Sequence, residues 1–260
     1  PAFVGHFGPK ATQTKIKAAL LDIGFSDVWE VAVGADAGAL EEAEHYAHGV
    51  ATGEVPFLLT SCCPSWAMLG KKYFPEVIDQ ISNALTPMVA TARAARQTNQ
   101  NAKIVFVGPC VAKKLEASRK SVRSEVDFVI TFEELAAMFE AKEIDFNTYD
   151  KEVELNDAFG AGRGYAVASG VAGAIEACVK EYYPGTDIKI DHVEGLAECR
   201  KMLLQAKAGK KNGYLIEGMG CPGGCVAGAG TNIPVNKANV QVKKFVKEAE
   251  AFVPPETAKY

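Results

Sequence analysis

EGMGCPGGCVAG, at residues 217–228, places two cysteines, Cys221 and Cys225, in a backbone too rich in glycine for an ordinary hydrophobic core. Thiolates are the ligands that soft iron and zinc sites require. Glycine gives the backbone the freedom to turn tightly around such a site. The run therefore predicts a metal-binding turn.

Two further cysteine motifs lie far from this turn in the sequence. TSCCPSW, at residues 60–66, contains the adjacent pair Cys62 and Cys63, and PCVAKKLE, at residues 109–116, contains Cys110. A proline stands beside a cysteine in all three motifs, which favours turns over the periodic face of a core element. Three turns of this kind predict one shared site.

The composition limits the class of protein. With 260 residues, of which 48% are hydrophobic and 23% charged, the chain is expected to form one globular unit with two lobes. The net charge of -4 gives no electrostatic footprint for nucleic acid or an anionic membrane. No apolar run approaches the roughly 18 to 20 residues that span a bilayer, and no signal-peptide pattern opens the sequence. We therefore expect a cytoplasmic protein with no nucleic-acid or membrane partner.

The seven cysteines are an odd number at low density, unlike the cysteines of a disulfide-stapled secreted domain. Reduced, metal-binding thiols are the expectation. Cys178 and Cys199 lie outside the motifs on apolar helical stretches, so both are interpreted as small buried hydrophobic residues. The sequence starts at Pro1 instead of Met, which suggests that further residues precede it.

Hydrophobic spacing alternates between helix and strand along the chain. Predicted helices cover residues 15–25, 39–50, 66–73, 87–98, 132–141, 171–182, 196–208 and 243–252, and predicted strands cover residues 28–33, 56–59, 104–107, 127–131, 188–193 and 214–217. This order predicts an α/β fold of two lobes, each a mainly parallel sheet flanked by helices, with the metal cluster in the cleft between them.

The polar segment 145–156 is the best candidate for a crossover, so we expect an N-terminal lobe at residues 1–150 and a C-terminal lobe at residues 151–260. Ligands of open α/β sheets gather beyond the carboxyl ends of the strands. Cys62, Cys110 and Cys221 each follow a predicted strand, so we expect the three motifs to meet there.

Five motif cysteines are one more than a four-ligand cluster or zinc site requires. Backbone amides of the glycines beside Cys221 and Cys225 are expected to turn toward inorganic sulfur, where such hydrogen bonds tune the potential of an iron-sulfur cluster. Zinc has no need of that arrangement. An iron-sulfur cluster with one surplus thiol is therefore favoured.

The three motifs resemble the signatures of the catalytic domain of iron-only (FeFe) hydrogenases, TSCCPxW, PCxxKxxE and ExMxCPGGCxxG, which occur here in order over essentially the whole chain. The resemblance implies reversible reduction of protons to H2. It also implies an H-cluster, in which a 4Fe-4S cluster is joined through one cysteine to a di-iron subcluster with CO, cyanide and azadithiolate ligands. By motif, Cys63, Cys110 and Cys221 would bind the 4Fe-4S cluster and Cys225 would bridge to the di-iron subcluster.

The surplus thiol, Cys62, would relay protons as a general acid and base, for which the ordinary thiol pKa of about 8.5 is suitable. The resemblance places further residues beside the cofactor, namely Lys113, Met219, Pro109, Ser61 and a strand that contains Pro1 and Ala2. Lys113 would donate to a cyanide ligand. Without the resemblance, a lysine in a Lys-Lys pair would be read as solvated surface.

Glu42, twenty residues before Cys62, and Ser82, twenty residues after it, fit the proton pathway of the resembling enzymes. A buried Glu42 would have a raised pKa and would pass protons, whereas a surface glutamate beside Glu41 and Glu44 would not. The next acidic position of the pathway is occupied by His45. This histidine is a candidate proton carrier, and the residues of the outer part of the proton pathway are not assigned.

Two departures from the family pattern predict a divergent subgroup with altered catalytic bias, rate or oxygen tolerance. Gly108 stands where the resembling enzymes carry methionine, and Met88 stands where they carry glutamine. Phe159, Ser169 and Gly170 fall in the glycine-rich segment that would wrap the cofactor. A structural turn is the equal alternative for that segment.

Three functions compete. The first is a hydrogenase, the second a sensory relative with the same cluster, and the third a non-enzymatic iron-sulfur assembly factor of the same fold. Cys62 argues against the sensor, and Gly108 argues mildly for it. No ferredoxin-like cysteine spacing occurs in the sequence, so electrons would come from a ferredoxin or from N-terminal iron-sulfur domains absent from this chain. The di-iron subcluster would come from maturation proteins.

Overall fold

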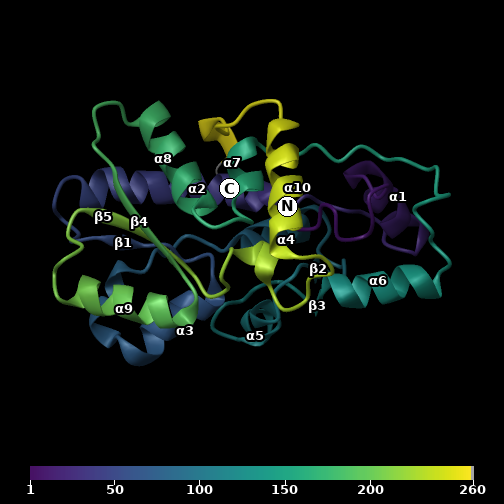
Figure 1. Ribbon diagram of the computed structural model, residues 1–260. Coiled ribbons are helices and arrows are strands. Elements are labelled where there is room, and N and C mark those ends of the chain that lie inside the picture. Colours follow the sequence, from purple (N-terminus) through teal and green to yellow (C-terminus); the bar gives the residue numbers. More distant parts are fainter. Residues whose placement is uncertain (259–260) are drawn as a thin grey trace.

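The computed structural model describes residues 1–258, in which helices surround two parallel sheets (Figure 1). The larger sheet has the order β1-β5-β4, with β1 at Leu58–Leu59, β5 at Tyr214–Met219 and β4 at Lys189–Glu194. The smaller sheet pairs β2 (Val105–Val107) with β3 (Phe128–Ile130), again in parallel. The predicted α/β fold of parallel sheets flanked by helices is confirmed.

The helices are α1 (Gln13–Asp22), α2 (Ala32–His45), α3 (Pro64–Tyr73), α4 (Pro87–Thr98), α5 (Ala112–Ser118), α6 (Phe132–Ala141), α7 (Gly160–Gly164), α8 (Gly170–Tyr182), α9 (Leu196–Lys207) and α10 (Val235–Lys247). Short helical turns are η1 (Tyr46–Val50), η2 (Pro75–Gln80), η3 (Cys225–Ala227) and η4 (Glu256–Ala258). None of the helices within residues 1–258 is long and apolar enough to cross a bilayer.

The central strand β5 is buried on both faces, as its apolar run requires. Leu215 and Met219 pack with α2 and α8, whereas Ile216 packs with α3 and α9. Alternate residues of a strand point to opposite faces, so one strand supplies both cores. Figure 1 shows α2 and α8 on one side of this sheet and α3 and α9 on the other. The larger sheet pairs β1, which precedes residue 150, with β5, which follows it. The division of the chain into two lobes at residue 150 stays a prediction.

Two predicted elements near the ends of the chain are wrong in kind or extent. Residues 28–33 form no strand but lead into α2, which begins at Ala32 instead of residue 39. Glu30 in this segment is buried and pairs with Arg163, at 2.7 Å between Oε1 and Nε, so it does not mark the solvent-facing side of a strand. The last helix begins at Val235, eight residues before its predicted start, because Pro234 precedes it as the N-cap residue.

The glycine-rich residues 160–164, for which no helix was predicted, form the short helix α7. The carboxylate of Asp36 accepts the amide N–H groups of Phe159 at 2.8 Å and Gly162 at 2.7 Å. A carboxylate at this position satisfies amide groups at the start of a helix that have no partner within it. The long-range contact explains why local composition failed to predict the helix.

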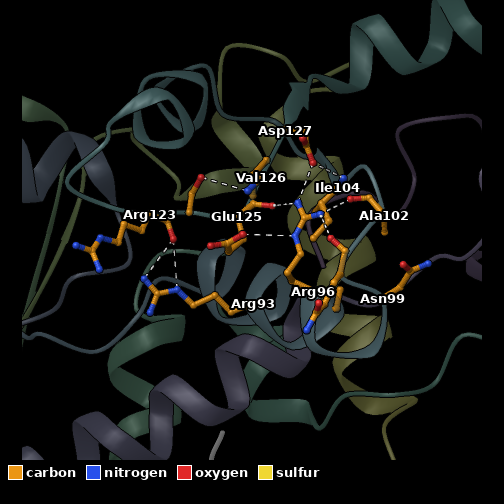
Figure 2. A network of polar contacts seen from close by, with 12 residues as sticks. Arg93, Arg96, Asn99, Ala102, Ile104, Arg123, Glu125, Val126 and Asp127 are labelled. Atoms are coloured by element: carbon orange, nitrogen blue, oxygen red, sulfur yellow. Dashed lines mark hydrogen bonds and ion pairs between the residues drawn. The ribbon is translucent and has the colours of Figure 1, made fainter.

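Two arginines of α4 hold the segment that joins α5 to β3 (Figure 2). Arg93 Nη2 donates to the carbonyl oxygen of Val122 at 3.1 Å. Arg96 Nη2 donates to the carbonyl oxygen of Glu125 at 3.1 Å and pairs with the Asp127 carboxylate at 3.0 Å. Asp127 also accepts a backbone N–H at the start of the smaller sheet. The arginines thereby fix the sheet from whose first strand the second cysteine motif emerges.

Candidate metal centre

A cavity of about 530 Å³ is lined by the carboxyl ends of β2 and β5, the start of α3 and one side of α4. All five motif cysteines line it, namely Cys62, Cys63, Cys110, Cys221 and Cys225. The rule that ligands gather beyond the carboxyl ends of parallel strands therefore placed the three motifs correctly. The other two cysteines, Cys178 and Cys199, are fully buried in the cores on either side of the larger sheet.

The first and third motifs interlock through glycine. The ring of the buried Trp66 lies against Gly218, so that a Cβ built on this residue would overlap the indole. The indole N–H donates to the carbonyl oxygen of Thr60 at 3.1 Å. One step along the turn, the Gly220 amide donates to Cys63 Sγ at 3.3 Å. Glycine is needed at 218 because the tryptophan takes the place of a side chain.

Gly218→Ala is expected to lower the free energy of unfolding by about 1–3 kcal/mol, since the added methyl forces the packed indole to move. The midpoint of urea unfolding measures this loss. Gly173→Ala is the matched control, because no atom lies within 4 Å of the position its Cβ would take in α8. Alanine in that helix should raise the free energy of unfolding by about 0.5–1 kcal/mol. Equal free energies of unfolding for the two variants would contradict the close packing of Trp66 against Gly218.

Burial controls the electrostatics of the thiols. It raises the pKa of Cys110 and Cys221, and it raises the pKa of Cys225 to about 12, with the neighbouring thiols as a further cause. Cys63 is the N-cap residue of α3, and the amide groups at the start of α5 partly oppose the rise for Cys110. A cation in the cavity is what would make the thiolate forms favourable, so metal binding would release protons.

The thiols surround a volume and do not converge on one point. Within residues 1–258, no three His, Cys, Asp or Glu side chains are arranged to hold a single metal ion. A structural zinc ion needs four such ligands at about 2.0–2.3 Å, and a catalytic one needs three, whereas a cubane spreads its ligands over separate iron atoms. The arrangement fits an iron-sulfur cluster with thiolate ligands on several sides.

The glycine amides of the CPGGC turn have other partners than the ones we expected. The Gly223 amide donates to the Glu194 carboxylate, and the Gly224 amide donates to the carbonyl oxygen of Cys221 at 3.1 Å. Gly224 has a φ of 85°, and a Cβ there would lie 2.7 Å from the Ala168 nitrogen. These glycines are required for close backbone packing. In this turn the amide directed at a thiol is that of Gly220.

Cys62 lies in front of a buried carboxyl. Glu42 on α2 is 2% exposed, and its Oε1 accepts the Ser61 amide at 3.3 Å. Burial raises the pKa of Glu42 to about 7, against the hydrogen bond that the Ser82 side chain makes with it. Burial, and next the charge of Glu42, raises the pKa of Cys62 well above its ordinary value. The ordinary thiol pKa expected from the sequence is therefore wrong, and Cys62 holds its proton at neutral pH.

Lys113 is buried, so the alternative of solvated surface, which the sequence left open without the family resemblance, does not hold. Its Nζ donates to Glu116 Oε2 at 2.6 Å and to the carbonyl oxygen of Cys62 at 3.3 Å, and it lines the cavity. The next residue, Lys114, is exposed and pairs with Glu134 at 2.5 Å. The lysine and glutamate of the PCxxKxxE motif thus form one buried ion pair at the cavity wall.

The remaining predicted residues divide into two groups. Those that line the cavity are Met219, Pro109, Met88, Gly108, Pro1 and Ala2. Those that do not line it are Ser61, Glu42 and Ser82, which lie behind Cys62, and His45, which is half-buried at the end of α2. Pro1 and Ala2 belong to a run of turns and not to the predicted strand. A Cβ on Gly108 would lie 2.5 Å from the Phe106 ring, so this ring occupies the space of a larger residue.

The segment between α7 and α8 contributes other residues than those expected. Phe159, Ser169 and Gly170 do not line the cavity, whereas Tyr165 and Ala166 do. The Glu217 carboxylate, from the third motif, accepts the Ser169 amide at 2.8 Å and a second amide of α8. The structural-turn alternative therefore holds for Ser169. Sequence reasoning missed Tyr165 and the role of Glu217, for which no local pattern gave a signal.

Residues 1–229 match the family described as "Iron only hydrogenase large subunit, C-terminal domain", and the chain belongs to this family. It is 28% identical over 263 residues to the periplasmic [Fe] hydrogenase large subunit of Nitratidesulfovibrio vulgaris, which covers 84% of this chain and 62% of that protein. A solved variant of the [FeFe]-hydrogenase HydA1 from Chlamydomonas reinhardtii has the same fold, with a TM-score of 0.72 at 21% identity over 96% of this chain and 82% of that one.

A shorter match connects the chain to another class of protein. It is 36% identical over 97 residues to the cytosolic Fe-S cluster assembly factor NAR1 of Kluyveromyces lactis, which covers 37% of this chain and 21% of that protein. The chain spans 62% and 48% of the length of two curated hydrogenases it matches. The proteins that this chain resembles therefore include both hydrogenases and an iron-sulfur assembly factor.

Proposed function

We propose that this chain is the catalytic domain of an iron-only hydrogenase and that it reversibly reduces protons to H2. The observation that carries the proposal is the fifth thiol. Four thiols suffice to hold a cluster, yet Cys62 also lines the cavity, with the buried carboxyl of Glu42 behind it. A protonated thiol backed by a carboxyl that titrates near neutral pH is suited to proton transfer and has no use in a purely structural cluster site.

Cys63, Cys110 and Cys221 would hold the 4Fe-4S cluster, and Cys225 would join it to the di-iron subcluster. When bound, such an H-cluster would accept electrons from an external donor and supply the open iron coordination that H2 formation needs. Lys113 would present its ammonium group to an anionic ligand of the di-iron subcluster, since its Nζ already lies at the cavity wall beside Cys62. The apolar lining, including Met88 and Met219, would keep water away from the reacting groups.

Proton transfer would pass through side-chain atoms of this chain. Cys62 Sγ would give its proton to the amine of the azadithiolate ligand and recover one from the carboxyl of Glu42. The Ser82 hydroxyl, hydrogen-bonded to that carboxyl, continues the route away from the cavity. In the direction of H2 oxidation the same groups act in reverse, since Glu42 takes up the proton and releases it outward. A pKa of about 7 makes this carboxyl equally ready for both directions at neutral pH.

Electrons would come from a ferredoxin or from iron-sulfur domains elsewhere in the protein. Cys178 and Cys199 are each buried in a separate core, and neither belongs to a second group of thiols within residues 1–258. Maturation proteins would supply the di-iron subcluster. The proposed location is the cytoplasm.

The second candidate is an iron-sulfur assembly factor, which the 36% identity to NAR1 over 97 residues favours. Such a protein would need the cluster ligands but neither a buried proton relay nor a buried lysine at the cavity. Cys62, Glu42 and Lys113 together therefore favour the hydrogenase.

The infrared spectrum of the chain produced together with hydrogenase maturation proteins tests the proposal. We expect CO and cyanide stretching bands, iron in excess of four atoms per chain, and H2 evolution with a reduced dye as electron donor. Cys199→Ala, which alters a thiol outside the cavity, should keep all three. A chain that binds four iron atoms with sulfide but shows no CO or cyanide band would contradict the hydrogenase and support the assembly factor.

A further inference from the structure

The carboxylate of Glu194 holds the turn that carries two of the cavity thiols. Glu194 is the last residue of β4 and lies opposite Met219 in the register with β5. Its Oε2 accepts the amide N–H of Gly223, which lies midway between Cys221 and Cys225. Because consecutive Cα atoms are 3.8 Å apart, the Gly223 Cα lies within about 7.6 Å of the Cα of either cysteine. The carboxylate therefore acts on the turn right beside both thiols.

The Gly223 amide is directed away from the cavity. All five thiols line the cavity, but neither Glu194 nor Gly223 does. Gly223 has a φ of 99°, and a Cβ there would lie 2.6 Å from Val235 Cγ2 at the start of α10. The end of β4 is fixed in turn, because the Gly195 amide donates to the carbonyl oxygen of Met219 at 2.8 Å. The turn is thus held between β4 and α10, with its central N–H on the carboxylate behind it.

Most other amides of this run also have acceptors within the protein. The amides of Gly224, Val226 and Gly228 donate to carbonyl oxygens of the chain at 2.9–3.1 Å. Gly220, whose amide donates to Cys63 Sγ, is the exception. Hydrogen bonds to the sulfurs of an iron-sulfur cluster help to set its reduction potential. A donor stabilises the negative charge that reduction adds, so a turn with its amides occupied elsewhere keeps the potential low.

The charge of Glu194 acts in the same direction. Two other carboxylates nearby in the sequence are neutralised by lysines, since Asp191 pairs with Lys211 and Glu198 pairs with Lys201. Within residues 1–258, no cation forms an ion pair with Glu194. Its side chain belongs to a half-buried residue, where solvent and salt screen a charge less than at an exposed one. An unpaired negative charge beside the turn opposes the addition of an electron to a cluster bound there.

We propose that Glu194 is a positioning residue that lowers the reduction potential of the cluster bound by the CPGGC turn. It does so by drawing the Gly223 amide away from the cluster and by placing a negative charge next to it. The inference rests on the proposed function, because it takes the four thiols to bind an iron-sulfur cluster. A lower potential makes the reduced cluster a stronger electron donor, which favours proton reduction over H2 oxidation.

A redox titration of the full chain, loaded with iron and sulfide alone and followed by its visible absorption, tests the proposal. Glu194→Gln keeps an acceptor oxygen for the Gly223 amide but removes the charge, so the midpoint potential should shift to a more positive value. Glu194→Ala also frees the amide and should shift the potential further in the same direction. Glu198→Gln is the matched control. It changes the net charge equally, but its carboxylate is exposed and paired with Lys201, so the potential should stay unchanged.

An unchanged potential in Glu194→Gln, or an equal shift in Glu198→Gln, would overturn the inference. Loss of the four-iron cluster from both Glu194 variants would also overturn it, because the carboxylate would then serve to form the site. Either result leaves the proposed function standing if the unsubstituted chain shows CO and cyanide bands after maturation. The expected shift in a chain without those bands would support the inference and overturn the hydrogenase. Failure of the unsubstituted chain to bind a four-iron cluster would overturn both.

Discussion

Cys62→Ala is expected to lower the rate of H2 evolution by about two to four orders of magnitude while the cofactor remains bound. Cys62 is the cavity thiol that the four cluster ligands leave over, and its raised pKa keeps a proton at the cavity wall. Alanine removes this proton donor but none of the proposed iron ligands. The iron content and the CO and cyanide bands should therefore match those of the unsubstituted chain, while H2 evolution with a reduced dye collapses.

Two comparison variants separate chemistry from packing. Cys62→Ser keeps the size of the side chain, but a hydroxyl is a far weaker acid than a thiol, so this variant should be nearly as slow. Cys178→Ala removes a thiol whose pKa burial raises to about 12 but which does not line the cavity. It should retain the full rate per bound cofactor. Undiminished turnover in Cys62→Ala would eliminate the proposed relay.

Glu42→Gln is expected to remove a large part of the pH dependence of stability. The pKa of Glu42 is raised from 4.5 to about 7 in the folded protein. Below pH 4.5 both the folded and the unfolded chain hold the proton. As the pH rises toward 7, the unfolded chain releases the proton and the folded chain keeps it, so stability falls through this window and levels off above it. The total loss is roughly 3 kcal/mol for a shift of this size.

Glutamine stays neutral at every pH, so the Glu42→Gln variant escapes this loss. The difference in free energy of unfolding between variant and unsubstituted chain should therefore grow in favour of the variant by roughly 3 kcal/mol from pH 4.5 to pH 8. Asp36, whose pKa burial also raises to about 7, is present in both proteins and cancels in the difference. Urea unfolding at a series of pH values measures it. A difference that is constant across the range would contradict a buried, neutral Glu42.

The sequence predicted the parts of the site that depend on where strands end. Cys62, Cys110 and Cys221 follow parallel strands, and parallel strands bring their carboxyl ends to one edge, so local pattern and one topological rule were enough to place them together. The burial and raised pKa of Glu42 followed from the family resemblance and its place on a helix. These inferences needed no knowledge of side-chain packing.

Several of the missed features depend on contacts between distant segments. Tyr165 lines the cavity and packs in one core with Ala39 and Leu40 of α2, more than a hundred residues earlier in the sequence. The early start of α2 accompanies the pairing of Glu30 with Arg163. Neither contact has a signature in the local spacing of polar and apolar residues. The same is true of the CPGGC amides, whose partners are a neighbouring strand and the turn itself.

The contact between Trp66 and Gly218 bears on the order in which the protein is assembled and on how its sequence evolves. Two of the three cysteine turns are joined there by an aromatic ring and a bare backbone, with no metal in the contact. We therefore expect the chain to reach its native topology first and to bind its cofactor afterwards. Selection on this glycine and tryptophan would act through the stability of the fold, whereas selection on the thiols would act through cluster binding. A descendant that abandoned the metal would lose its cysteines long before it lost this pair.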